Sequence, residues 1–169
     1  MDYNRLNLFS GVKSLSRRKK TWIRMVSWVL FCIYIAGLAY FLFFSERFGR
    51  NTSTDTYRYN LVLFQEINRF ITYREMIGME SFVINIIGNI LAFSPFGFIL
   101  PIISPRNRKF LHVLILSFEL SLLIEVLQLV YRVGCFDVDD LFMNTLGGVI
   151  GYIVFAISYG YMKRRGKRR

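Results

Sequence analysis

The chain has few of the residues that build disulfides and transition-metal sites. Among its 169 residues are one histidine, two cysteines and three prolines. No Cys-x-x-Cys pair and no Cys–His spacing typical of a zinc site occurs, so we expect neither a metal nor a cofactor. Cys32 lies inside a long apolar segment and Cys135 in a predicted outer loop, and their different expected depths exclude a disulfide between them.

Acidic residues are also few, with 11 Asp and Glu against 22 Lys and Arg, which gives a net charge of +11. So basic a chain can be a nucleic-acid-binding protein. Here, however, the basic clusters flank apolar segments, at residues 17–20, 106–109 and 163–169. That placement is typical of the cytoplasmic loops of membrane proteins. We therefore expect no nucleic-acid partner, and we expect the clusters to contact anionic lipids of the inner leaflet.

Apolar residues, in contrast, are abundant. They make up 54% of the chain, with 17 phenylalanines, against about 45–50% in soluble domains. Four segments exceed the length of about 20 residues that crosses a bilayer. These are residues 22–44, 82–103, 110–131 and 141–162. Since only a helix satisfies all its backbone polar groups within one such segment, the sequence predicts an all-α integral membrane protein with four transmembrane helices.

The charge pattern also predicts the organisation of the chain in the plasma membrane. A basic N-terminal arm (1–21) precedes the membrane domain (22–162), and a basic tail (163–169) follows it. The first apolar segment exceeds the roughly 7–15 residues of a signal peptide, which indicates an uncleaved signal anchor. Most Lys and Arg residues fall on one side of the four segments, so we expect both termini in the cytoplasm.

The longest connection, between the first and second segments, contains a further helical pattern. Between residues 60 and 75 apolar side chains recur at helical spacing, with polar residues between them. Leu63, Phe64, Ile67 and Ile71 belong to this apolar face. The pattern predicts an amphipathic helix that lies on the outer membrane surface or caps the bundle.

Polar residues of three predicted helices fall at one membrane level, where an ionisable side chain costs at least about 2.5 kcal/mol. The second helix runs inward and the third outward, so the start of one and the end of the other meet at the same side. A short loop and the start of the fourth helix follow there. We expect a ligand-binding site made by Asn85, Asn89, Glu125, Gln128, Arg132, Asp137, Asp139, Asp140 and Asn144.

Structural explanations of the same residues are also open. Asp139 or Asp140 could cap the fourth helix, because a carboxylate accepts hydrogen bonds from the free N–H groups there. Asn85 and Asn89, at i and i+4, could join helices by hydrogen bonds. Glu125 requires a partner or a proton when buried, so it either pairs with a nearby Arg or Asn or serves as a functional carboxylate.

Small residues and prolines indicate how the helices pack. Gly147, Gly148 and Gly151 form a small-residue pattern typical of close helix approach. Pro95 and Pro101 lie in or near the end of the second helix, where we expect them to kink it and free backbone carbonyls.

Two motifs resemble the VanZ-like family. The first is Asn85-x-x-Gly88-Asn89-x-x-x-Phe93-x-Pro95-x-Gly97. The second is Glu125-x-x-Gln128-x-x-x-Arg132, followed by Asp137-x-Asp139-Asp140-x-x-x-Asn144-x-x-Gly147-Gly148. Upstream, Asn60-Leu61-x-x-Phe64 is similar to the family's Asn-Leu-x-Pro-Phe segment, with Leu63 where proline is common. The resemblance covers residues 60–152 and includes every candidate site residue.

The resemblance implies a function at the cell envelope, because the family takes its name from a membrane protein associated with resistance to the glycopeptide teicoplanin. The expected activity is to modulate glycopeptide susceptibility by handling a lipid-linked or amphiphilic ligand at the outer leaflet. The expected partners are membrane lipids, together with a lipid-linked envelope precursor or a glycopeptide. The sequence does not decide the oligomeric state.

Two other functions remain open. In the first, the protein is a membrane-embedded enzyme acting on an envelope lipid, with Glu125 as general acid or base. Asp137, Asp139 and Asp140 would then bind a divalent cation, since hard cations prefer carboxylate oxygens. In the second, the protein is a structural or adaptor protein that joins a complex. The sequence alone does not decide whether the protein is an enzyme.

Overall fold

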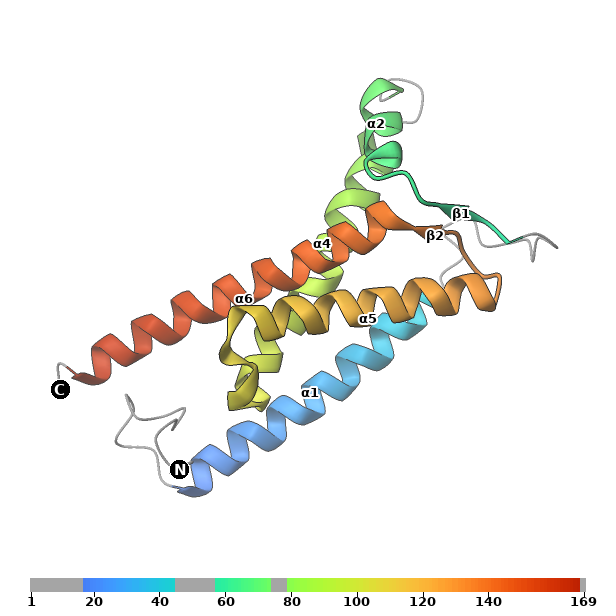
Figure 1. Cartoon of the computed structure of the whole chain (residues 1–169). Coiled ribbons are helices and arrows are strands. Elements are labelled where there is room, and N and C mark those ends of the chain that lie inside the picture. The colour runs from blue at the N-terminus through green and yellow to red at the C-terminus, as the bar shows by residue number, and fades with distance from the viewer. Residues whose placement is uncertain (1–16, 45–56, 74–78, 168–169) are drawn as a thin grey trace.

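The computed structural model describes residues 17–44, 57–73 and 79–167, and these are mostly helical (Figure 1). The long helices are α1 (Arg17–Phe44), α4 (Met79–Ile103), α5 (Phe110–Val130) and α6 (Val138–Lys167). These four are long and apolar enough to cross a membrane, over Thr21–Phe41, Asn85–Ile103, Phe110–Val130 and Val138–Arg165. The prediction of an all-α protein with four transmembrane helices is confirmed.

Three of the four long helices extend beyond the apolar segments that predicted them, whereas α5 ends one residue before the predicted end of its segment. α1 begins at Arg17 within the predicted basic arm, of which residues 1–16 lie outside the described part. α6 begins at Val138 and continues through residues 163–167 of the predicted tail. The difference arises because hydropathy marks only the segment suited to hydrocarbon, whereas backbone hydrogen bonds continue the helix into its polar flanks.

Helix α6 lies at the centre of the packing, with its most extensive contacts to α4 and further contacts to α5. Successive long helices alternate in direction, so the start of α1 and the end of α6 lie at the same end of the bundle (Figure 1). α1 contacts mainly α4 and leaves most of its side chains exposed. Its Leu38 joins Phe93 and Ile124 in a small buried cluster, and the hydroxyl of Tyr34 donates to the Ala92 carbonyl at 2.7 Å.

Glycines allow α4 and α6 to approach closely. A Cβ atom added at Gly97 would overlap the backbone carbonyl of Gly148. Added at Gly147 or Gly151, it would overlap a backbone carbonyl of α4. The close approach predicted from the glycine pattern of the fourth helix is therefore confirmed; Gly147 and Gly151 make it against α4, and Gly148 also makes it against Ser117 of α5.

Both prolines lie inside α4, which remains helical from Met79 to Ile103. Pro95 has no N–H to donate to the carbonyl of Leu91, four residues earlier. The hydroxyl of Ser94 donates to that carbonyl instead, at 3.0 Å. The carbonyl that the proline frees is thus satisfied within the helix.

The connection between α1 and α4 combines a strand pairing with a short helix. β1 (Tyr59–Asn60) pairs in parallel with β2 (Phe136–Asp137), and α2 (Gln65–Thr72) follows after a turn. The helix is therefore shorter than the predicted range 60–75, of which residues 74 and 75 lie outside the described part. Its position on a membrane surface stays a prediction.

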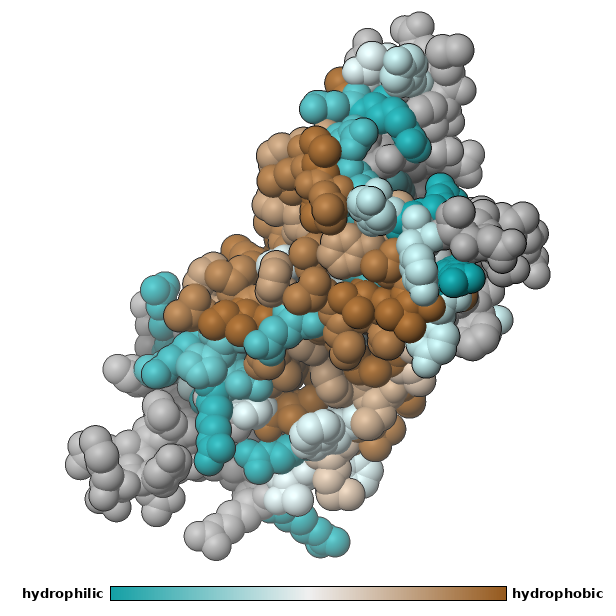
Figure 2. All heavy atoms as spheres, turned by 45° about the vertical axis from the view of Figure 1, so that its right-hand side comes forward, coloured by the Kyte–Doolittle hydropathy of each residue, from teal (hydrophilic) through white to brown (hydrophobic). Residues whose placement is uncertain are grey.

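Hydrophobic residues gather across the middle of the molecular surface. In Figure 2 they form a brown region between hydrophilic residues at the lower left and the upper right. Exposed apolar side chains belong to all four long helices, with Trp22, Ile87, Phe118 and Ile153 as examples. This distribution suits a bundle whose middle is surrounded by lipid.

Candidate functional site

The candidate site lies where α5 ends and α6 begins, beside the strand pair. The register joins Tyr59 to Phe136 and Asn60 to Asp137, so residues far apart in sequence become neighbours. The backbone N–H of Phe136 also donates to the carbonyl of Arg58 at 3.0 Å. We call the four acidic residues here, Glu125, Asp137, Asp139 and Asp140, the carboxylate network.

Glu125 is the member that α5 contributes, and it is only 2% exposed. One of its oxygens, Oε2, accepts a hydrogen bond from the backbone N–H of Asp137 at 3.0 Å. A buried carboxylate needs such donors, because the loss of water otherwise disfavours its charged form. The bond ties the second half of α5 to the strand that precedes α6.

Asp137 caps α6. Its Oδ1 accepts from the backbone N–H of Asp139, at the second position of the helix, at 2.8 Å. The side-chain amide of Asn60 donates to both carboxylate oxygens, at 3.2 and 3.3 Å. Burial raises the pKa of Asp137, the negative charge of Asp139 adds to the increase, and the hydrogen bonds to Asp137 oppose it.

Asp139 binds the start of a different helix, α2. It is fully buried, and its two oxygens accept from the backbone N–H groups of Phe64 and Ile67, the latter at 3.4 Å. Phe64 is the N-cap residue of α2 and has a left-handed backbone, with φ of 66°, and no side-chain cap of its own. A carboxylate from α6 therefore supplies the cap that the local sequence lacks.

Contacts between side chains extend the site to α4 and deeper into the bundle. Asn89 of α4 donates to Oδ1 of Asp140 at 2.6 Å. Asn144 of α6, 2% exposed, donates to the hydroxyl of Ser121 on α5 at 3.0 Å. Among the described residues, the carbonyl oxygen of Asn144 and the hydroxyl of Ser117 are buried without a hydrogen-bond partner.

These contacts decide between some of the structural alternatives. Asn89 joins two helices, as the hydrogen-bond explanation expected. The contact that caps α6 comes from Asp137, whereas the hydrogen bonds described above for Asp139 and Asp140 reach α2 and α4. Asn85 lies half-buried one turn before Asn89 on α4.

The positions of Glu125, Gln128 and Arg132, at i, i+3 and i+7, would share one face of a continuous helix. The structure does not keep Arg132 on that face. α5 ends at Val130, and Arg132 has φ of 55°. The N–H groups of Arg132 and Val133 bond to the carbonyls of Leu129 and Gln128, which is the Schellman arrangement of a helix end. The left-handed residue turns the chain, so the exposed Arg132 lies over the ring of Tyr57 at 4.7 Å instead.

Gln128 stays with the network as a buried residue. It is 5% exposed, and its side chain packs against Gly134 so closely that a Cβ there would be 3.3 Å from Cβ of Gln128. A side chain at Gly134 would therefore press on Gln128. The glycine keeps the turn between α5 and β2 close to the end of α5.

The structure adds two residues that the sequence did not mark as part of the site. Asn60 binds Asp137, and its only signal in the sequence is its place in the upstream Asn-Leu segment. Ser121 binds Asn144, and its signal was its position one turn before Glu125 on the same face of α5. Among the described residues, no three His, Cys, Asp or Glu side chains are arranged to hold a metal ion together.

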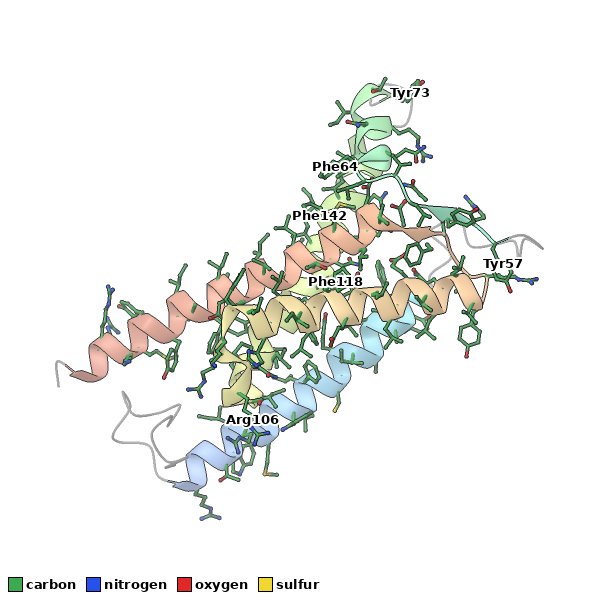
Figure 3. All side chains as sticks on the ribbon, viewed as in Figure 1. Tyr57, Phe64, Tyr73, Arg106, Phe118 and Phe142 are labelled. Atoms are coloured by element: carbon green, nitrogen blue, oxygen red, sulfur yellow. The ribbon has the colours of Figure 1, made fainter. Side chains whose placement is uncertain are left out.

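Apolar residues surround the polar ones on the surface. Phe64 packs its ring edge-to-face on Phe142 of α6, with centroids 5.6 Å apart (Figure 3). The neighbouring Leu61, Val62 and Leu63 are exposed, each by about half or more of its surface. The site therefore combines a buried polar network with an exposed apolar margin.

Comparison with known proteins places these residues in context. The model of the protein family described as VanZ/LLP1 matches residues 31–159, most of the chain. The chain is also similar to Protein VanZ of Enterococcus faecium, with 30% identity over 79 residues. That alignment covers 47% of this chain and 48% of the relative, so it spans about half of each. No solved structure matches the chain.

Proposed function

Because this chain belongs to the VanZ/LLP1 family, we propose that it modulates the susceptibility of cells to glycopeptide antibiotics such as teicoplanin. In this proposal it sits in the plasma membrane and handles a lipid-linked or amphiphilic ligand at the outer leaflet. Its four apolar helices make it a multi-pass membrane protein. The location in the plasma membrane, the orientation of the helices and the nature of the ligand are parts of the proposal.

The orientation in this proposal follows from the distribution of charge. Arg106, Arg108 and Lys109 lie in the short connection between α4 and α5, at the end opposite the carboxylate network. Lys and Arg in short loops favour the cytoplasmic side. The carboxylate network then faces the outer leaflet, where a glycopeptide or an envelope precursor is accessible.

The observation that carries the proposal is the combination of buried carboxylates with an exposed apolar margin. Glu125 and Asp139 are almost fully buried at the edge of segments that suit lipid, where an ionisable side chain is energetically costly. An amphiphile needs both kinds of surface. Its apolar chain would lie against Leu61, Val62 and Leu63, while its polar head would reach Asn60, Asn89 and Asp140.

The β1–α2 segment (residues 57–73) would act as the cover of this site. It is attached to the bundle through Asn60 with Asp137 and through the start of α2 with Asp139. Donors on a ligand head could replace these N–H groups and compete for the same carboxylate oxygens. Exchange of segment donors for ligand donors would couple ligand binding to movement of the cover.

The test is the inhibitory concentration of teicoplanin for susceptible Gram-positive cells that express the protein, compared with an empty vector. Membrane abundance is measured by blotting for every strain. We expect a reproducible increase with the wild type. No increase at confirmed abundance would overturn the antibiotic part of the proposal.

Matched variants test the site itself. Glu125→Gln keeps an acceptor for the Asp137 N–H but removes the charge, and we expect it to abolish the increase. Glu119→Gln makes the same change on an exposed position of α5 outside the network, and we expect it to behave as wild type. Equal protection by Glu125→Gln and wild type at equal abundance would exclude the carboxylate network as the site.

A further inference from the structure

The end of the bundle opposite the carboxylate network has an excess of positive charge. We call it the basic end, and its described members are Arg24 on α1, Arg106, Arg108 and Lys109 at and after the turn η3 (Pro105–Arg108), and Lys163, Arg164 and Arg165 on α6. Every Asp and Glu that the structure describes lies elsewhere, in α2, the first turn of α4, the middle and second half of α5, β2, or the start of α6. The described part of the chain thus provides no carboxylate to neutralise this end.

Arg108 differs from the other cations because its side chain is held in place. Its Nε donates to the carbonyl of Pro101 at 3.5 Å, and its guanidinium lies over the ring of Tyr159, 5.2 Å from the centroid. Its own carbonyl accepts from the hydroxyl of Tyr152 at 2.7 Å. Contacts with α4 and α6 therefore fix both the backbone and the side chain of this arginine.

One end of the guanidinium is nevertheless unsatisfied. Nη2 of Arg108 is buried and has no hydrogen-bond partner among the described residues. A buried donor of a charged group without a partner is costly, and proteins normally pair it. Tyr159 interacts with the same side chain but leaves Nη2 unpaired.

A second positive charge adds to the need for an anion. Burial lowers the pKa of Arg108, and Arg24 of α1 lowers it further by repulsion, while Tyr159 raises it. Arg24 is therefore close enough to Arg108 for the two charges to repel, and the described part of the chain places no acid at this end. An anion between them would satisfy Nη2 and relieve the repulsion.

We propose that the basic end binds the phosphate of an anionic membrane lipid, with Arg108 as the fixed hydrogen-bond donor and Arg24 as the second cation. The planar guanidinium fork suits phosphate oxygens. This site is more specific than the general attraction of basic loops to anionic lipid, because it depends on two named arginines rather than on total charge.

The surface beside these arginines favours a lipid over free phosphate. Trp22, Met25 and Trp28 are exposed around Arg24 on α1, by 49–66%. Tryptophan is enriched at membrane interfaces, where its ring lies at the level of the headgroups. A phosphate at Arg24 would therefore lie at headgroup depth, with acyl chains along the exposed face of α1.

Native mass spectrometry of the full chain would test the site. The protein is released from micelles that contain phosphatidylglycerol and phosphatidylcholine in equal amounts, and the lipids that remain bound are counted. We expect the wild type to retain phosphatidylglycerol preferentially. We expect Arg108→Gln and Arg24→Gln each to weaken this retention by about fivefold or more, the effect of losing a charge-assisted contact to the phosphate.

The control is Arg106→Gln, which removes the same charge from an exposed position two residues from Arg108. It should change retention by less than about twofold, since it leaves the fixed guanidinium intact. Equal losses for Arg106→Gln and Arg108→Gln would overturn the site in favour of diffuse attraction. Arg24→Gln keeps the proposal testable if Arg108→Gln does not fold.

A second arm identifies the source of the phosphate. Inorganic phosphate is titrated into the protein in neutral detergent, and thermal stability is compared with that in phosphatidylglycerol micelles. We expect stabilisation by the lipid and none by millimolar inorganic phosphate. Equal stabilisation by the two would overturn the assignment to a lipid, and equal retention of phosphatidylcholine by the wild type would overturn the preference for an anionic one.

Discussion

At the scale of residues, the polar interior of the bundle contains both satisfied and unsatisfied groups. Glu125 and Asp139 accept hydrogen bonds from backbone N–H groups, and Asn144 donates to Ser121. Ser117, one turn before Ser121 on the same face of α5, has a buried hydroxyl without a partner among the described residues. The two side chains are the same, but the hydroxyl of Ser121 has a hydrogen-bond partner and that of Ser117 has none among the described residues.

This difference predicts opposite results for the same substitution. Ser121→Ala removes the acceptor of Asn144, so we expect the free energy of unfolding to fall by about 1 kcal/mol. Ser117→Ala removes only an unpaired hydroxyl and should leave stability unchanged or slightly higher. Unfolding of the purified protein in detergent, followed by circular dichroism, would measure both. A larger loss for Ser117→Ala would show that Ser117 makes the more important contact.

At the scale of elements, two helices depend on α6. α4 packs against it through glycines, and α2 receives its cap from Asp139 rather than from its own N-cap residue, Phe64. In both cases the partner comes from a distant part of the sequence. α2 is only eight residues long, so these contacts must supply most of its stability.

The glycine contact predicts that alanine lowers stability at one glycine of α6 but does not lower it at another. A Cβ at Gly151 would overlap the Ser94 carbonyl, so we expect Gly151→Ala to reduce stability by about 1–3 kcal/mol, or to separate α4 from α6. A Cβ at Gly160 meets nothing within 4 Å, and Gly160→Ala should be neutral or stabilising because alanine favours helix. Thermal unfolding of the two variants in the same detergent makes the comparison. Equal stability of Gly151→Ala and wild type would mean that the helices are further apart than described.

At the scale of the whole molecule, the two ends of the bundle differ in charge. One end holds the carboxylate network, and the other holds Arg24, Arg106 and Arg108. The start of α1 and the end of α6 lie at that second end (Figure 1). A protein with this polarity should insert in one orientation, because Lys and Arg in short loops favour the cytoplasmic side.

The orientation can be measured with reporters fused to the C-terminus of the full chain. We expect a fused green fluorescent protein to be fluorescent and a fused alkaline phosphatase to be inactive. Each of these two results indicates that the C-terminus lies in the cytoplasm. The reverse pattern would place the carboxylate network in the cytoplasm. The outer-leaflet ligand proposed above would then have to be abandoned, whereas the phosphate site at the basic end would be tested independently by lipid retention.

Much of the fold could be predicted from the sequence, because a bilayer imposes simple requirements on it. Four apolar segments of sufficient length can only be helices, and they appear as α1, α4, α5 and α6. The candidate residues Asn89, Glu125, Asp137, Asp139, Asp140 and Asn144 do meet at one end, because alternating helix directions bring them there. Chain direction and hydropathy are properties of local sequence and need no knowledge of packing.

Only the tertiary structure decided which of these residues contact one another. The left-handed turn at Arg132 removes that side chain from the face of Glu125, and the parallel pairing of β1 with β2 brings Asn60 to Asp137. The cap of α2 comes from Asp139, 75 positions from Phe64 in the sequence. Spacing rules apply within one element, whereas these contacts depend on how separate elements are placed, and that placement results from packing α4 and α5 on α6.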